Sequence, residues 1–81
     1  MKNNQELLDR ITFDPHVMCG KATIRGMRIT AEQVLKFLAA GGTTEDLLED
    51  YPELELADIS AVLLYASRLV AEEHVYLLKA A

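Results

Sequence analysis

The sequence predicts a small, mainly α-helical domain that begins with a short β-hairpin. First, the chain has 81 residues, which is enough for one domain. Second, 51% of its residues are hydrophobic and 26% are charged, whereas disordered chains are poor in apolar residues. Third, apolar residues follow a helical spacing from residue 30 onward, while residues 11–29 are interrupted by glycine and proline. These observations together favour helices preceded by a hairpin.

The first third of the chain is expected to hold the hairpin. Residues 1–10 are polar apart from one leucine pair, so they predict a short frayed helix or a disordered lead. Ile11-Thr12-Phe13 has strand-forming residue types, and Asp14-Pro15 signals a turn after it. Residues 22–29 alternate apolar and polar up to Ile24, and the alternation breaks at Gly26. This pattern predicts a second strand that ends in a hairpin turn or a bulge.

Two helices follow, each with a start and a stop signal. Thr30 and Gln33 have the spacing of a capping box, and Gly41-Gly42 can end this helix because glycine readily adopts the left-handed conformation. Thr43-Thr44 begins the next helix, whose first turn carries acids that suit the helix dipole. Tyr51-Pro52 stops it.

A longer third helix is predicted from about Leu56, since no glycine or proline occurs from residue 53 to the end. The domain is therefore expected to cover residues 11–73, with residues 74–81 as a helix extension or tail. Residues 61–66 are apolar all round the helix axis, which predicts burial on every side. A chain of this length cannot cover every side, so we expect self-association; the alternative is a few exposed leucines. The expected contact residues are Val62, Leu64, Tyr65 and Leu69.

The chemistry of the chain favours a binding protein over an enzyme. Cys19 lies near His16, and His74 is distant in sequence, which makes a poor nucleophilic pair and a poor metal set. The sequence has no phosphate-binding glycine motif. We therefore predict no enzymatic activity, no cofactor, no metal and no small-molecule substrate. The single cysteine, the polar start and the lack of a long apolar run predict a cytoplasmic protein that makes no contact with a membrane.

Charge is distributed unevenly along the chain. The net charge is −5, which argues against autonomous binding to nucleic acid. Residues 1–28 nevertheless hold five Lys and Arg against three acids, whereas residues 29–81 hold three against ten. The candidate nucleic-acid-binding residues are Lys21, Arg25 and Arg28. Arginines around a turn can equally form surface salt bridges to the acidic helices, and the sequence leaves both readings open.

A series of short segments carries a resemblance to a known family. It consists of Ile11-Thr12-Phe13-Asp14-Pro15, Gly20-Lys21, Ile24-Arg25-Gly26, Arg28-Ile29, Val34-Leu35, Leu38-Ala39-Ala40-Gly41, residues 45–52, Asp58-Ile59, Ala61 and Leu64-Tyr65-Ala66. In order and spacing these segments resemble the family of small domains of unknown function numbered 433, over roughly residues 11–70. The chain departs from the family pattern at Ala22, Met27 and Glu55, where the family favours Pro, Thr and Thr.

The resemblance implies a fold and a function. The implied fold is a short hairpin followed by a three-helix, homeodomain-like helix-turn-helix unit, in a bacterial or archaeal protein. Family members are regarded as VapB-type antitoxins encoded beside a PIN-like ribonuclease toxin. We therefore expect a protein that neutralises such a toxin and helps to repress its own operon. The alternative is a homo-oligomeric helix-turn-helix DNA-binding regulator without a toxin.

The implied toxin suggests two kinds of contact. Active sites of PIN-like nucleases are acidic, so an arginine could pair with their carboxylates; the candidates are Arg25 and Arg28, with Arg68 as the alternative. An apolar helix could lie in a groove of the toxin. The residues expected in that second contact are Val62, Leu64, Tyr65, Leu69, Val75, Tyr76, Leu77 and Leu78.

Overall fold

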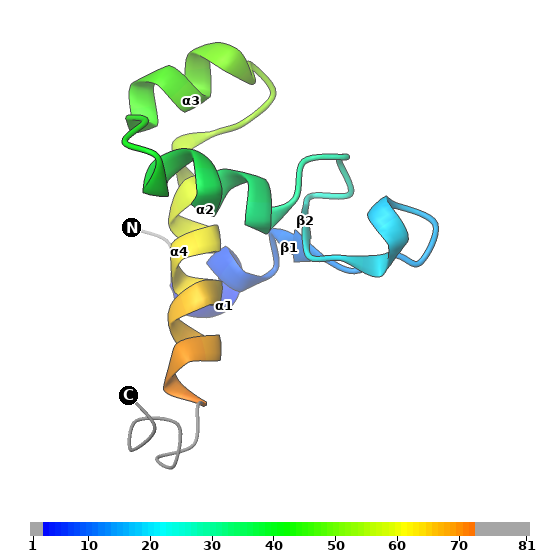
Figure 1. The fold of residues 1–81 in the computed structure, drawn as a ribbon. Helices are drawn as coiled ribbons and strands as arrows, with labels where there is room; N and C mark the ends of the chain where they lie inside the picture. Colours follow the sequence, from blue (N-terminus) through cyan, green and yellow to red (C-terminus); the bar gives the residue numbers. More distant parts are fainter. Residues whose placement is uncertain (1–2, 73–81) are drawn as a thin grey trace, which may run out of the picture.

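The computed structural model describes residues 3–72 and contains a group of helices with a two-stranded sheet at one side of them (Figure 1). The elements in chain order are α1 (Asn4–Leu8), β1 (Ile11–Thr12), the short 3-10 helix η1 (Met18–Gly20), β2 (Thr23–Ile24), α2 (Ala31–Ala39), α3 (Thr44–Asp50) and α4 (Leu56–Ala71). The predicted mainly α-helical fold, with an early hairpin and a long last helix, is confirmed. The predicted tail 74–81 lies outside the described residues.

The hairpin consists of two antiparallel strands and a separate tight turn. β1 pairs with β2 in the register Ile11 to Ile24 and Thr12 to Thr23. After β2 the chain reverses at Arg25 and Gly26, which have φ angles of 48° and 75°. The Met27 N–H donates to the Ile24 carbonyl at 2.9 Å. Two consecutive positive φ angles closed by this hydrogen bond are typical of a type I′ turn, so the predicted break at Gly26 is a turn.

The start signals predicted for α2 and α3 are confirmed. The Thr30 hydroxyl accepts a hydrogen bond from the Gln33 N–H at 3.0 Å, and the Gln33 side chain accepts one from the Thr30 N–H at 2.8 Å. The Thr43 hydroxyl likewise accepts from the Asp46 N–H at 3.0 Å. Each hydroxyl satisfies a backbone donor that has no partner inside the helix. The φ angle of +97° at Gly41 ends the α2 segment, as the glycine pair predicted.

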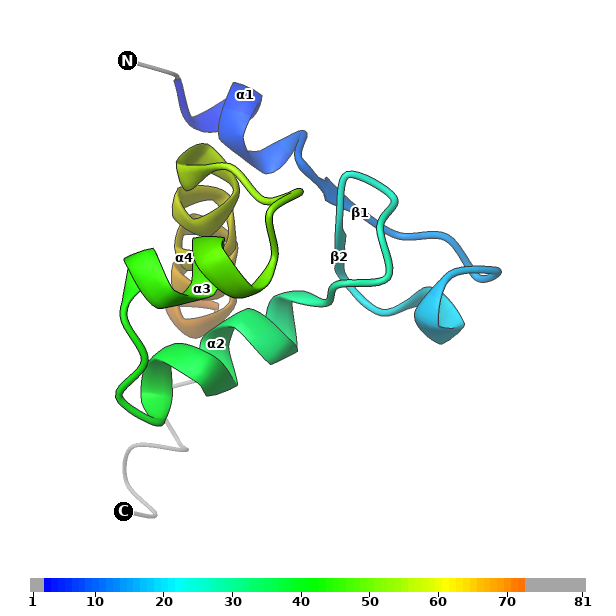
Figure 2. The same ribbon diagram turned by 90° about the horizontal axis from the view of Figure 1, so that it is seen from above.

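Helix α1 is an ordered part of the fold. The Asn3 side chain caps it by accepting from the Glu6 N–H at 2.8 Å, and Leu7 packs against the hydrophobic core. Figure 2 shows α1 beside α4, on the side opposite α2. The sequence predicted a short frayed helix or a disordered lead here, and the structure has a short, capped helix at Asn4–Leu8. The cap and the partly buried Leu7 give α1 a stability that its short length alone would not provide.

Helix α4 packs against α1, α2 and α3, and one stripe along it remains exposed. The fully buried side chains Ile24, Val34, Leu47 and Val62 come from β2, α2, α3 and α4, so these four elements share one core. Leu63, the residue after Val62, is 49% exposed. The prediction that Val62 contacts a partner is wrong, because neighbours within the chain cover it completely. Within residues 3–72, no helix is both long enough and apolar enough to cross a bilayer.

Candidate functional site

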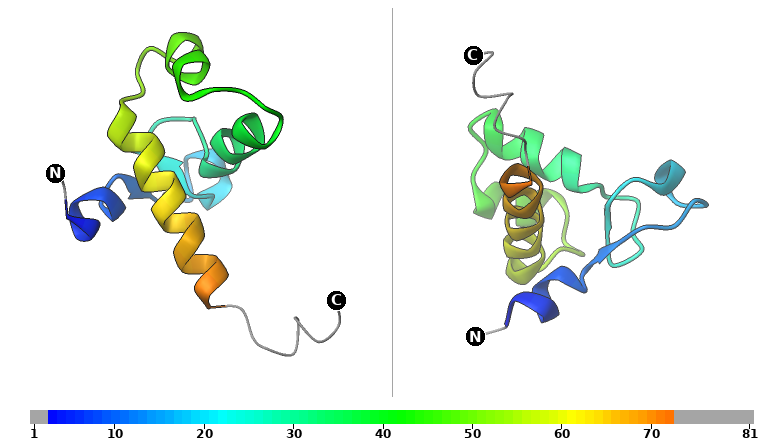
Figure 3. Two further views of the ribbon diagram at one scale, coloured as in Figure 1. Left: turned by 90° about the vertical axis from the view of Figure 1, so that its left-hand side faces the viewer. Right: turned by 90° about the horizontal axis from the view of Figure 1, so that it is seen from below.

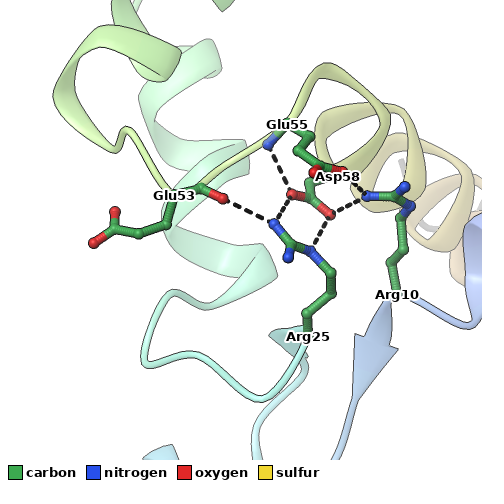
Figure 4. A network of polar contacts seen from close by, with 5 residues as sticks. All are labelled: Arg10, Arg25, Glu53, Glu55 and Asp58. Atoms are coloured by element: carbon green, nitrogen blue, oxygen red, sulfur yellow. Dashed lines mark hydrogen bonds and ion pairs between the residues drawn. The ribbon is translucent and has the colours of Figure 1, made fainter.

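A completely buried carboxylate, that of Asp58, lies at the centre of a polar network (Figure 4). Arg25 binds it with two parallel hydrogen bonds, from Nε to Oδ1 at 3.0 Å and from Nη2 to Oδ2 at 2.8 Å. Arg10 donates from Nη1 to Oδ1 at 2.9 Å, and the Glu55 N–H donates to Oδ2 at 2.8 Å. Arg10 reaches Asp58 from the segment between α1 and β1, and Arg25 reaches it from the turn after β2. Asp58 therefore ties both segments to the first turn of α4.

The network keeps Asp58 ionised despite its burial. Burial alone would raise the pKa of Asp58, but hydrogen bonds from Arg25, from the Glu55 backbone and from Arg10 together hold the pKa below its ordinary value. The Arg10 side chain also binds Glu55 at 2.8 Å, which lowers the pKa of that carboxyl. Arg25 Nη2 donates further to the Glu53 carbonyl at 2.8 Å. Every acceptor of the buried carboxylate thus has a partner, as a stable buried charge requires.

This network separates the three cations that the sequence grouped as a nucleic-acid-binding set. Arg25 is bound to Asp58 and its side chain stays 37% exposed, so a contact with DNA or with a toxin would compete with this ion pair. Lys21 is exposed and lies 3.5 Å from Glu32. Arg28 is exposed, and within residues 3–72 it makes no ion pair; the same holds for Arg68 on α4.

An apolar groove of about 480 Å³ lies between α2 and α4. Its lining includes small and aliphatic side chains from α2, an aromatic ring and a leucine from α4, and the residue before β2. These residues are Ala31, Leu35, Ala39, Tyr65, Leu69 and Ala22, with Lys21, Glu32 and Lys36 as the charged members. Tyr65 and Leu69 are separated by one helical turn, so both side chains lie on the same side of α4.

The charged residues of the groove give it a net positive charge. The Glu32 carboxylate lies between two lysines. Its Oε1 is 3.5 Å from Lys21 Nζ, and its Oε2 is 3.1 Å from Lys36 Nζ. The hydrogen bond from Lys36, followed by the charges of the two lysines, lowers the pKa of Glu32, so this acid is ionised at neutral pH. Two cations and one anion leave one positive charge beside an apolar lining. The groove therefore suits an apolar surface that carries an acidic group.

The structure assigns the predicted partner-binding residues to different places. Tyr65 and Leu69 line the groove, while Leu64 is half-buried and does not contribute to the lining. Val75, Tyr76, Leu77 and Leu78 lie outside the described residues. Leu35 and Ala39 also line the groove and were not among the predicted partner-binding residues. The available signal was the four-residue spacing of Ala31, Leu35 and Ala39, which sets them on one line along the helix.

Of the residues considered for catalysis or metal binding, His74 lies outside the described residues. Cys19 is exposed, in the 3-10 helix η1. In the part of the chain that the structure describes, no three His, Cys, Asp or Glu side chains are grouped in a way that could hold a metal ion. Within the described residues, the candidate sites are thus the buried network around Asp58 and the groove between α2 and α4.

Comparison with known proteins identifies the family. No curated protein and no solved structure matches the chain. Residues 11–66, well over half of the 81-residue chain, match the family described as "Protein of unknown function (DUF433)". The matched segment runs from β1 through most of α4, so it contains the groove lining except Leu69, together with Asp58, Arg25 and Glu55 of the network. The chain therefore belongs to the DUF433 family.

Proposed function

We propose that this protein is an antitoxin-type binding protein that neutralises a ribonuclease toxin by holding one of its helices in the groove between α2 and α4. The observation that carries the proposal is the groove itself, an apolar surface with a net positive edge on a chain of net charge −5. The family resemblance described above supports a PIN-like ribonuclease as the toxin. Repression of its own operon would then be a property of the complex.

The lining of the groove favours a helix as its occupant. Small-molecule sites combine an apolar lining with several well-placed polar groups that fix the orientation of the ligand. Here the polar groups are the charges of Lys21, Glu32 and Lys36, and the remaining lining is apolar. An amphipathic helix places apolar side chains at intervals of three and four residues into such a groove. We infer that the bound helix carries acids along one flank, where they meet Lys21 and Lys36.

The charge distribution supports a protein partner over nucleic acid. Two of the arginines, Arg10 and Arg25, are paired with the carboxylates of Asp58 and Glu55. Helix α3 carries four exposed acids, and a surface of this kind repels phosphates. These acids are Glu45, Asp46, Glu49 and Asp50. A homeodomain-like unit that uses α3 and α4 to approach DNA would have to overcome this repulsion.

Arg28 is the cation that we assign to inhibition of the toxin. Its side chain is exposed, and it has no ion pair within residues 3–72, in contrast to Arg25. An arginine can bind two oxygens of a carboxylate cluster at once, and this pairing would displace the metal ions that such a nuclease needs. Binding would then depend on the groove, and inhibition on Arg28.

The test uses the product of the gene adjacent to this one. Binding of the two purified proteins is measured by titration calorimetry, and RNA cleavage by the neighbour's product is measured in parallel. Ala39 and Ala40 are neighbouring exposed alanines, and Ala39 lines the groove while Ala40 does not. Ala39→Glu should weaken binding at least about tenfold, as for a central interface residue. The matched control Ala40→Glu, with the same charge change at the same helix end, should bind like the wild type.

Two outcomes would contradict the proposal. If the neighbour's product does not cleave RNA, or if the wild-type chain does not inhibit it, the antitoxin function is wrong. If Ala39→Glu binds as tightly as Ala40→Glu, the groove is not the binding surface. Arg28→Ala should relieve inhibition while affinity changes little, and unchanged inhibition by this variant would remove Arg28 from the mechanism.

A further inference from the structure

The face of α4 that points away from the core carries three exposed apolar side chains in line. Leu56, Leu63 and Val70 are 62%, 49% and 63% exposed. They are seven residues apart, and an α-helix turns through nearly two full turns in that distance, so they lie along one side. Asp58, Ala61 and Val62 on the opposite side are fully buried. Figure 3 (left) shows α4 in front of the other elements, with none of them crossing it.

Small side chains alternate with the large ones along this face, which we call the outer stripe. Its order is Leu56, Ser60, Leu63, Ser67 and Val70, with alternating spacings of four and three residues as in helix–helix seams. The Ser67 hydroxyl already donates to the Leu64 carbonyl at 2.7 Å. Covering Ser67 with an apolar side chain would therefore not leave its donor without a partner, and the usual penalty for burying a hydroxyl is avoided.

We propose that the outer stripe binds the outer stripe of a second copy of this chain, with the two α4 helices antiparallel. When Leu63 of one copy faces Ser60 of the other, Leu56 faces Ser67, since both pairs are centred on the same two-fold axis. Each large side chain then fills the space above a small one, and every contact occurs twice. A parallel pair would set leucine against leucine and leave gaps at the serines.

The charge of the molecule agrees with this occupant. A chain of net charge −5 repels its own copies over most of its surface. Between Leu56 and Ala71, α4 carries two charged side chains: Asp58, which is buried and faces the core, and Arg68. The four exposed acids of α3 belong to another helix. The outer stripe is therefore an uncharged surface through which two acidic copies can approach.

This interface is separate from the groove, and the chain offers a matched pair of substitutions to show it. Leu63 and Leu69 lie on the same helix and are 49% and 50% exposed, but Leu63 is in the outer stripe and Leu69 lines the groove. Sedimentation equilibrium from low micromolar to near-millimolar concentration should show the wild-type mass rising from 9.0 kDa toward twice that value. Leu63→Glu should remain monomeric over the whole range, and Leu69→Glu should dimerise like the wild type.

The orientation is tested by disulfide trapping in a Cys19→Ser background, which removes the natural thiol. Chains carrying Leu56→Cys and Ser67→Cys are mixed and oxidised, and the mixed disulfide should form in preference to either homodisulfide.

In the sedimentation experiment, a wild-type chain that stays monomeric at every concentration would overturn the interface, as would dimerisation of Leu63→Glu that matches the wild type. Circular dichroism checks the fold of each variant, and Val70→Glu provides a second substitution in the stripe. Preferential homodisulfides would overturn the antiparallel arrangement.

Discussion

Asp58 contributes to stability through its charge, because both of its side-chain partners are cations that the fold brings to it. The carboxylate has no contact with water, and Arg10 and Arg25 reach it from segments that are otherwise held by a two-stranded sheet. If the charge is removed, Arg25 loses its carboxylate partner, and Arg10 keeps only Glu55, whose side chain is 59% exposed. Loss of one member of a buried ion pair commonly destabilises a protein by about 3–5 kcal/mol. Both arginines keep some exposure to water, so the lower end of this range applies.

We expect Asp58→Asn to lower the free energy of unfolding by about 3 kcal/mol at neutral pH. The folded-state pKa of Asp58 is depressed, so the unfolded chain binds the extra proton first as the pH falls. The stabilisation is thus complete above the unfolded pKa near 4 and disappears as the pH falls through the folded pKa. Urea unfolding at a series of pH values should show the difference between wild type and variant shrinking in acid.

The control for this experiment is Asp50→Asn, which removes the same charge from an exposed position at the end of α3. It should change stability by less than about 0.5 kcal/mol, as surface substitutions usually do. A gap between wild type and Asp58→Asn that stays constant from neutral pH to acid would contradict the role given to the carboxylate charge.

The sequence alone could not predict the role of Asp58. It indicated an acid in the first turn of the last helix, where the dipole favours a negative charge. Its partners Arg25 and Arg10 are 33 and 48 residues away, and no local pattern relates such distant positions. For the same reason the sequence left open whether Arg25 binds a partner or forms a salt bridge within the chain. Only the folded arrangement distinguishes Arg25, which is paired with Asp58, from Arg28, which makes no ion pair within residues 3–72.

At the level of elements, the sequence predicted where a helix begins or ends whenever the interaction that fixes this point joins residues close together in the chain. The capping residues of α2 and α3 are three positions apart, so their spacing alone predicted both helix starts. The start of α4 near Leu56 and the stop after α3 also follow from nearby residues. The packing of α1 could not be predicted this way, because its contact surface belongs to α4, far along the chain.

The cap of α3 gives a test at this level. Thr43→Ala removes the hydroxyl that accepts from the Asp46 N–H, and we expect a loss of about 1 kcal/mol in the free energy of unfolding. Thr44→Ala, one residue later and inside the helix, is the matched control, and it should leave stability nearly unchanged. Thermal and urea unfolding of both variants provide the measurement. Equal losses for the two threonines would show that the hydroxyl of Thr43 has no special role.

At the level of the whole molecule, α4 separates two kinds of surface. One side, with Tyr65 and Leu69, forms the groove with α2, and the other carries Leu56, Leu63 and Val70. The sequence predicted an excess of apolar surface on this helix but placed Val62, Leu64, Tyr65 and Leu69 in one interface. Helical periodicity shows which residues share a side, and the positions of α1, α2 and α3 decide which side is covered. That arrangement depends on tertiary packing.

The net charge of the molecule predicts how the isolated chain behaves toward nucleic acid. The net charge is −5, and two of the cations that raised the local charge of the N-terminal third, Arg10 and Arg25, are paired with Asp58. Even proteins with basic surfaces bind non-specific DNA with Kd values of only about 10⁻⁴–10⁻⁶ M at physiological salt. We therefore expect fluorescence anisotropy with a short labelled duplex to show no saturable binding by the isolated chain in that range.

Any residual binding at low salt should depend on the exposed cations. Lys21→Ala and Arg28→Ala should each reduce it and lower its salt dependence, because each removes a cation that can replace a condensed counter-ion. Lys36→Ala, which removes the other lysine bound to Glu32, shows whether the edge of the groove takes part. Saturable binding at physiological salt that survives loss of both Lys21 and Arg28 would mean that another surface contacts DNA. In that case the repulsion expected from the acids of α3 would have to be overcome by contacts specific to a sequence, as in an autonomous DNA-binding regulator.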